Sequence, residues 1–159
     1  TLKIMADVKD LEPYSGNAEG LTAVLTDIVS TMPNPIVFKV AGYVVNAFEN
    51  VTQGDVLFAR ASDGQVGKAI ANDTLDKAVV AGIAETTVTA GNQVRVIVTG
   101  QVAVSTSIDA GDLYYLSASS AGSLTKTPPT TASHYVTLVG EAGTSNQLVL
   151  KIKRPIQLR

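Results

Sequence analysis

The stretch that decides the fold is Gly54-Asp55-Val56-Leu57-Phe58, because the chain repeats it as Gly111-Asp112-Leu113-Tyr114-Tyr115. In each copy a Gly-Asp turn precedes three apolar or aromatic residues, as where a strand leaves a tight turn and enters a core. The Gly-Asp block repeats at an offset of 57 residues, and later blocks follow in the same order. Gly64–Lys68 matches Gly122–Lys126 and Ala78–Ala84 matches Val136–Ala142 at an offset of 58, and Val94–Val98 matches Leu148–Ile152 after a small deletion. The sequence therefore predicts two similar β units, at about residues 51–98 and 108–152.

Residues 36–159 have a β pattern throughout. Runs rich in Val, Ile, Thr and Tyr alternate with turns that contain Gly, Asp, Asn or Ser, about every 8–12 residues. The expected strands are Ile36–Phe48, Val56–Ala61, Gly67–Ile70, Ala78–Ala84, Gln93–Val98, Gln101–Val104, Leu113–Ser117, Tyr135–Gly140 and Gln147–Lys153. Each unit is near the lower size limit of roughly 40–60 residues for independent folding. We therefore expect both units to share one core, in a mainly β fold that is a small pseudo-symmetric β-barrel or sandwich.

Two glycines stand inside expected strands. Gly82 and Gly140 occupy the same place in the two repeats. A glycine inside a strand usually marks a bulge or a close approach of another backbone. We expect one of these at both positions.

The first 35 residues have a different pattern, so we separate an N-terminal arm and helix (1–35) from the β domain (36–159). Thr1–Gly20 follows neither the helical nor the strand period, and is interpreted as an extended arm or a frayed terminus. Six apolar residues then fall on one helical face: Leu21, Val24, Leu25, Ile28, Val29 and Met32. Pro33 and Pro35 would end this short amphipathic helix. The helix either lies on the β domain of its own chain or packs at a subunit interface.

The composition excludes several kinds of site and partner. Cysteine is absent and there is one histidine, so neither thiol chemistry nor a two-histidine metal site within one chain is possible. The net charge is −2, which gives no basic footprint for nucleic acid or an anionic membrane. No apolar run approaches the ~18–20 residues of a membrane span. We expect neither nucleic acid nor a membrane as a partner.

Candidate catalytic residues are sparse. His134 stands alone in a loop ahead of a strand, and we interpret it as an exposed loop residue. Asp73 and Asp76 lack the glycine and terminal glutamate of a calcium loop, so a polar turn is the better interpretation. Asp55 and Asp112 are explained as turn residues by their matching places in the repeats. We therefore expect no catalytic, cofactor or metal site, and no enzyme.

Three blocks of the β region resemble a known class of proteins. They are Gly82-Ile83-Ala84, Thr99-Gly100-Gln101-Val102 and Gly111-Asp112-Leu113-Tyr114. Together with Val139-Gly140-Glu141-Ala142 they are similar to blocks in small structural proteins of tailed bacteriophages, above all capsid decoration (cement) and head-fibre proteins. The resemblance covers roughly Val51 to Leu158. It implies a β-barrel on the outside of a capsid, often a trimer over a junction between shell subunits.

The resemblance leads to a functional expectation. The protein would be a non-enzymatic capsid decoration protein that binds the major capsid protein on the outer surface of the virion and bridges neighbouring shell subunits. A homo-oligomer is expected, with a trimer favoured. The expected contact residues are Leu2, Ile4, Val8 and Leu11 in the arm and Leu21, Val24, Leu25, Ile28, Val29 and Met32 on the helix. The alternative is a head- or tail-fibre (adhesin) module that recognises a host surface. A hydrolase would be a third class, and loss of an activity on His134→Ala would indicate it.

Overall fold

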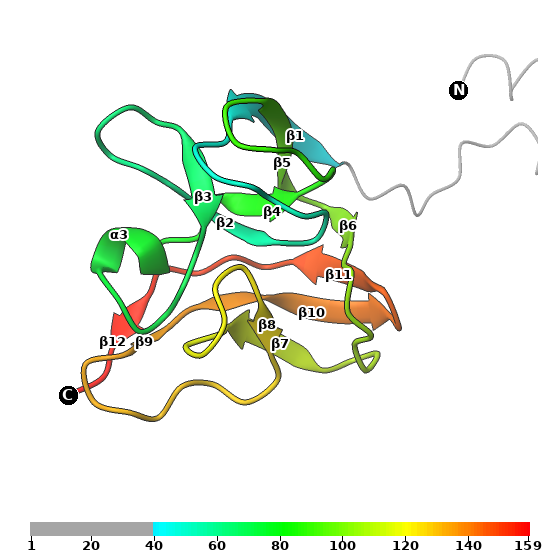
Figure 1. Ribbon diagram of the computed structural model, residues 1–159. Helices are drawn as coiled ribbons and strands as arrows, with labels where there is room; N and C mark the ends of the chain where they lie inside the picture. Colours follow the sequence, from blue (N-terminus) through cyan, green and yellow to red (C-terminus); the bar gives the residue numbers. More distant parts are fainter. Residues whose placement is uncertain (1–39) are drawn as a thin grey trace, which may run out of the picture. The chain divides into compact units, whose positions relative to one another are not determined.

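The computed structural model describes residues 40–159, which form two five-stranded antiparallel sheets and a small two-stranded one (Figure 1). The N-terminal sheet contains β1 (Ala41–Asn46), β2 (Val56–Ala59), β3 (Val66–Lys68), β4 (Gly82–Ala84) and β5 (Gln93–Thr99). The C-terminal sheet contains β6 (Gln101–Ala103), β7 (Leu113–Leu116), β8 (Leu124–Thr125), β10 (Leu138–Thr144) and β11 (Gln147–Leu150). β9 (Tyr135–Val136) pairs with β12 (Ile156–Gln157). The mainly β fold is thus confirmed. Because neither sheet closes into a barrel, the fold is of the sandwich kind.

The two large sheets have the same topology. Their strand orders are β1-β5-β4-β2-β3 and β6-β11-β10-β7-β8, so each strand of one has a counterpart at the same place in the other. The Gly-Asp turns also match: Gly54 and Gly111 have φ angles of 88° and 87°. Each donates its N–H to an equivalent alanine carbonyl, Gly54 to Ala84 at 2.9 Å and Gly111 to Ala142 at 2.7 Å. The blocks repeated in the sequence therefore occupy equivalent places in the two sheets.

Gly82 and Gly140 lie where two backbones approach closely. A Cβ at Gly82 would overlap the carbonyl oxygen of Ile97, and a Cβ at Gly140 would overlap that of Val149. At Gly140 the pairing with β7 also shifts its register. Glycine is required at both positions because any side chain would push the neighbouring strand away.

The two faces of each sheet can be matched through the strand register. In the N-terminal sheet Ala84 pairs with Val96, and in the C-terminal sheet Ala142 pairs with Leu148. We call the face that carries these pairs the front face of each sheet. The opposite face, the back face, carries Ile83 paired with Ile97 in the N-terminal sheet, and Glu141 paired with Val149 in the C-terminal sheet.

The sheets stack front to back. The main core lies between the back face of the N-terminal sheet and the front face of the C-terminal sheet. Its buried residues are Val56, Phe58, Ala69, Ala71, Val80, Ile83, Ile97, Val102, Val104, Ile108, Tyr114, Leu116, Val139, Ala142 and Leu148. A second core covers the front face of the N-terminal sheet and contains Ala47, Val51, Leu57, Val66, Ala84, Val94 and Val96. The N-terminal sheet is therefore buried on both faces, whereas the C-terminal sheet is buried only on its front.

The structure corrects some expected element boundaries. Residues 75–78 form one helical turn, α3 (Leu75–Ala78), which the sequence did not predict. The helix includes Ala78, which was expected to begin the Ala78–Ala84 strand. Asp76 in its first turn and Lys77 in its last suit the helix dipole. The buried hydroxyl of Thr137 donates to the Ala78 carbonyl at 3.0 Å, which ties α3 to the second repeat. The two-residue strands β8 and β12 were not expected, and β10 extends beyond Gly140 to Thr144.

Candidate interaction surface

The contact residues predicted for the arm and the helix, Leu2 to Met32, all lie outside the described residues. The described part begins at Val40, directly ahead of β1. β1 is therefore the first strand of the described part.

β1 is an edge strand with an unusual surface. It pairs with β5 over Ala41–Asn46 and has no second neighbour among residues 40–159. Val44 is 59% exposed and Tyr43 is 41% exposed, on opposite faces of the sheet. The strand contains no charged residue. Soluble proteins normally protect an edge of this length with a lysine, a proline or a bulge, because its N–H and C=O groups can otherwise pair with another chain. β1 has neither lysine nor proline, and its register with β5 shifts only at one end, between Ala41 and Gly42.

The other three edges of the two large sheets are short. β3 has three residues, and its Lys68 ammonium lies 3.6 Å from the Asp55 carboxylate. A parallel bridge from Ala47 also contacts Val66 of β3. β6 has three residues and β8 has two. Only β1 combines length, an apolar surface and the absence of charge.

The charges on the strand beside β1 are neutralised within the described part of the chain. Arg95 of β5 lies opposite Val44 in the register, and its guanidinium is 3.1 Å from the Glu85 carboxylate. On the other face, partial burial raises the pKa of the Tyr43 phenol, so this side chain stays neutral beyond its ordinary range. The surface around β1 is thus electrically neutral and only partly apolar, and it can be covered at a small desolvation cost.

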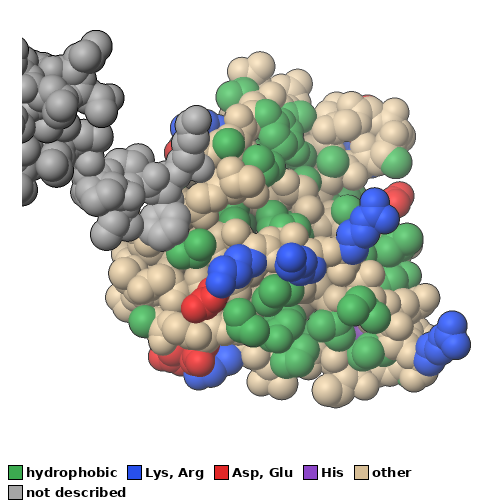
Figure 2. All heavy atoms as spheres, turned by 180° about the vertical axis from the view of Figure 1, so that it is seen from behind, with side chains coloured by type: hydrophobic (Ala, Val, Ile, Leu, Met, Phe, Trp, Pro, Cys, Tyr) green, Lys and Arg blue, Asp and Glu red, His purple; other side chains and the backbone are tan. Residues whose placement is uncertain are grey.

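The back face of the C-terminal sheet is a second exposed surface. Leu113 is exposed there, while Tyr115, Leu138 and Val149 are half-buried. Glu141 stands at the place that Ile83 occupies in the first repeat, and it forms an ion pair with Lys151 of β11. Seen from behind, hydrophobic side chains gather on this side of the molecule next to Lys and Arg side chains (Figure 2). The ion pair places charge on this face, and no further sheet formed by residues 40–159 packs against it.

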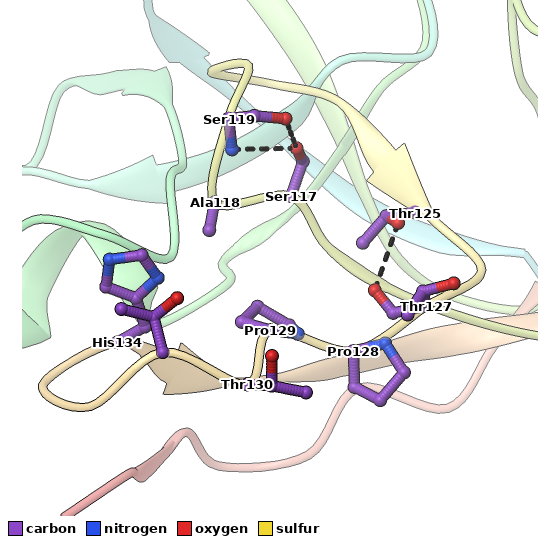
Figure 3. A pocket seen from close by; sticks show the side chains of 10 residues that line it. Ser117, Ala118, Ser119, Thr125, Thr127, Pro128, Pro129, Thr130 and His134 are labelled. Carbon is purple, nitrogen blue, oxygen red and sulfur yellow. Dashed lines mark hydrogen bonds between the residues drawn. The ribbon is translucent and has the colours of Figure 1, made fainter.

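A shallow pocket of about 300 Å³ is lined mainly by hydroxyl-bearing side chains and prolines. Ser117 and Ser119 lie on one side of it, Pro129 and Thr130 on the other, and His134 at one end (Figure 3). The Ser117 Oγ accepts hydrogen bonds from the N–H groups of Ser119 and Ser120, both at 3.2 Å. This hydroxyl therefore holds its own turn. The residues that line the pocket include no carboxylate that could orient His134 as a base.

His134 itself differs from the expectation. It is half-buried rather than exposed. Its backbone is fixed by a bond from its N–H to the Thr131 carbonyl and by a bond from the Leu158 N–H to its own carbonyl. Ser133, just before it, has a φ of 70°, which is uncommon for a residue other than glycine.

Three of the four acidic residues singled out in the sequence form side-chain contacts in local structure, and the fourth, Asp76, lies in the first turn of α3. The Asp55 carboxylate accepts the Thr52 N–H at 2.8 Å, and Asp112 forms an ion pair with Lys126 at 2.5 Å. Asp73 forms an ion pair with Lys77 at 2.6 Å, which lowers its pKa. Between residues 40 and 159 no group of three or more His, Asp or Glu side chains is placed to hold a metal ion. The same residues include no helix long and apolar enough to cross a membrane.

Sequence reasoning identified β1 as part of a strand but missed its exposure. The signal was in Val40-Ala41-Gly42-Tyr43-Val44-Val45, which has no polar residue on either face. A strand of this kind belongs either in the middle of a doubly covered sheet or at an edge that another chain covers.

Comparison with known proteins adds no assignment: no protein-family model matches the chain, and no curated protein matches it in sequence.

Proposed function

We propose that this chain is a non-enzymatic structural protein of a bacteriophage virion: a decoration protein that binds the major capsid protein on the outside of the head and bridges neighbouring shell subunits. It acts as a homo-oligomer, with a trimer favoured. The observation that carries the proposal is the uncharged, exposed strand β1 at the start of the described part. Such a strand supports a role in contacts with other polypeptides, which is also what the sequence resemblance implies.

The mechanism is thermodynamic linkage. A protein that binds the assembled shell, and not the separated subunits, stabilises the shell by RT ln(1 + [L]/Kd), which is about 2.7 kcal/mol at a hundredfold excess over Kd. Several attachment points on one oligomer add avidity. The sandwich supplies a rigid body, and the arm residues Leu2 to Leu11 extend across a neighbouring subunit and add a strand to one of its sheet edges.

The test is a binding experiment with expanded, empty capsids. The full chain should sediment with the capsids at a saturating number of copies that is a simple multiple of the lattice, and should raise the temperature at which they fall apart. Deletion of residues 1–16 should abolish binding while circular dichroism shows an intact β domain. The matched control is Ile156→Lys, which changes a 67% exposed residue far along the chain and should bind as well as the wild type.

Two outcomes would contradict the proposal. Binding to host cells or glycans, without binding to capsids, would indicate the adhesin alternative. Capsid binding that survives deletion of residues 1–16 would remove the arm from the mechanism.

A further inference from the structure

The edge of β1 that no strand of residues 40–159 covers is a site for a specific kind of partner. An edge strand is completed by another extended backbone, which supplies partners for its free N–H and C=O groups. The side chains of that partner must also suit the exposed surfaces of β1, which are uncharged on both faces and carry the apolar side chains of Tyr43 and Val44.

We propose that the partner is β1 of a second copy of this chain, paired antiparallel about a two-fold axis, so that the N-terminal sheets of two protomers form one continuous ten-stranded sheet. The inference concerns the homo-oligomer that the proposed function includes, and it does not depend on capsid binding. A contact of this kind gives an even number of protomers. It therefore stands as an alternative to a trimer, or as an addition to a threefold contact elsewhere.

Charge is the first argument for a second copy. In a two-fold contact every group meets its own symmetry mate or a close neighbour of it, so a charged edge would repel itself. β1 has no charge, and Arg95 of the neighbouring strand β5 is already paired with Glu85 within one protomer. Among residues 40–159, self-pairing of β1 thus brings no unpaired like charges together.

Strand register is the second argument. In an antiparallel pair, opposed residues share one face of the sheet. With the two-fold axis at Val44, this residue meets Val44 of the second copy on one face. On the other face Tyr43 meets Val45 of the second copy, and the symmetry repeats this contact. Aromatic with β-branched is among the favourable cross-strand pairs. One register therefore covers both exposed apolar residues of β1 at once.

The third argument comes from the other edges. β3, β6 and β8 have two or three residues each, and β3 is covered by a bridge from Ala47. The six-residue length of β1 is matched best by another β1. A contact between β1 and a short edge would leave half of the β1 backbone groups unpaired.

Two sets of variants of the full chain test the pairing. Val44→Lys places two like charges at the two-fold axis, and the cost to the fold is small because Val44 is 59% exposed. By sedimentation equilibrium the wild type should contain an even number of protomers, and Val44→Lys should halve that mass while circular dichroism stays the same. Ile156→Lys, at a residue of similar exposure outside β1, should keep the wild-type mass.

A single-cysteine variant provides an independent readout that does not require a destabilised contact. The chain has no cysteine, so Val44→Cys introduces the only thiol. A short bismaleimide should crosslink it to a covalent dimer in high yield, and Ile156→Cys should stay uncrosslinked. A monomeric or strictly trimeric wild type would overturn the proposal. So would an oligomer that survives Val44→Lys unchanged, or Val44→Cys that crosslinks no better than Ile156→Cys.

Discussion

Ile83 and Glu141 occupy equivalent places in the two sheets, but the front-to-back stacking buries only Ile83. Substituting each residue by the other's type, Ile83→Glu and Glu141→Ile, therefore tests the stacking directly. Ile83 is fully buried between the two sheets, whereas Glu141 lies on the open back face. Ile83→Glu should therefore disrupt the fold, and Glu141→Ile should be tolerated.

The magnitudes follow from burial. Removing the buried apolar branch of Ile83 costs about 2 kcal/mol. The new carboxyl must also be protonated to stay in an apolar core, which costs about 4 kcal/mol at pH 7 when its ordinary pKa is about 4.3. The sum of about 6 kcal/mol approaches the whole stability of a typical domain, about 5–15 kcal/mol. Glu141→Ile removes one partly exposed ion pair with Lys151, which is worth at most about 1 kcal/mol.

The assay is urea unfolding of both variants, followed by far-ultraviolet circular dichroism since the chain has no tryptophan. Ile83→Glu should be largely unfolded at about pH 7 and should gain stability on acidification to about pH 5. The sign follows because the buried carboxyl has a raised pKa, so the native state binds a proton that the unfolded state lacks. Glu141→Ile should keep its free energy of unfolding within about 1 kcal/mol of the wild type and should self-associate through the enlarged apolar face. Equal losses in the two variants, or a stable Ile83→Glu with no response to pH, would refute the stacking.

Three further predictions concern single contacts. Thr137→Val leaves the buried Ala78 carbonyl without its hydrogen bond and should cost about 1–3 kcal/mol, measured by urea unfolding. Gly140→Ala forces a Cβ onto the adjacent strand's carbonyl oxygen and should cost about 1–3 kcal/mol in the same assay. The Asp63 carboxyl, hydrogen-bonded by the Arg60 guanidinium, should titrate below the ordinary Asp pKa by NMR and return toward it in Arg60→Gln; an unchanged titration would rule out this cause.

The sequence repeat was the most informative signal. Local backbone requirements can be predicted from a sequence. Here they are indicated by the matched Gly-Asp turns, the matched glycines inside strands and the alternating valines. Gly82 and Gly140 lie at close backbone approaches, as expected. Strand boundaries were less accurate: two-residue strands such as β8 have no periodicity of their own and exist only because a neighbour pairs with them.

The direction of stacking could not be predicted from the pattern. Period-2 alternation separates two faces but does not say which of them meets the other sheet. In β5, Val94 and Val96 lie in one core while Ile97 between the sheets lies in the other, so all three are buried. The sequence did contain one indication, because an apolar Ile83 in the first repeat corresponds to a charged Glu141 in the second. The strand register is needed to show that both lie on the back faces of their sheets.

The interaction surface was only partly predictable. The residues that sequence analysis proposed for contact precede the described part, and they stay predictions. The exposure of Tyr43 and Val44 depends on β1 being the last strand of its sheet, and this is a property of the strand order. Short-range patterns do not encode strand order, because β1 pairs with a strand about fifty residues away.

The one-residue connection at Gly100, between β5 and β6, has a consequence for how the polypeptide is made. Everything that encloses the second core, from Ala47 to Val96, precedes this glycine, so the first half can shelter part of its apolar surface while the ribosome is still adding the second half. The second half has no separate core of its own, because its buried residues pack against the N-terminal sheet. We therefore expect the N-terminal sheet to form first during synthesis and the C-terminal sheet to pack against it afterwards.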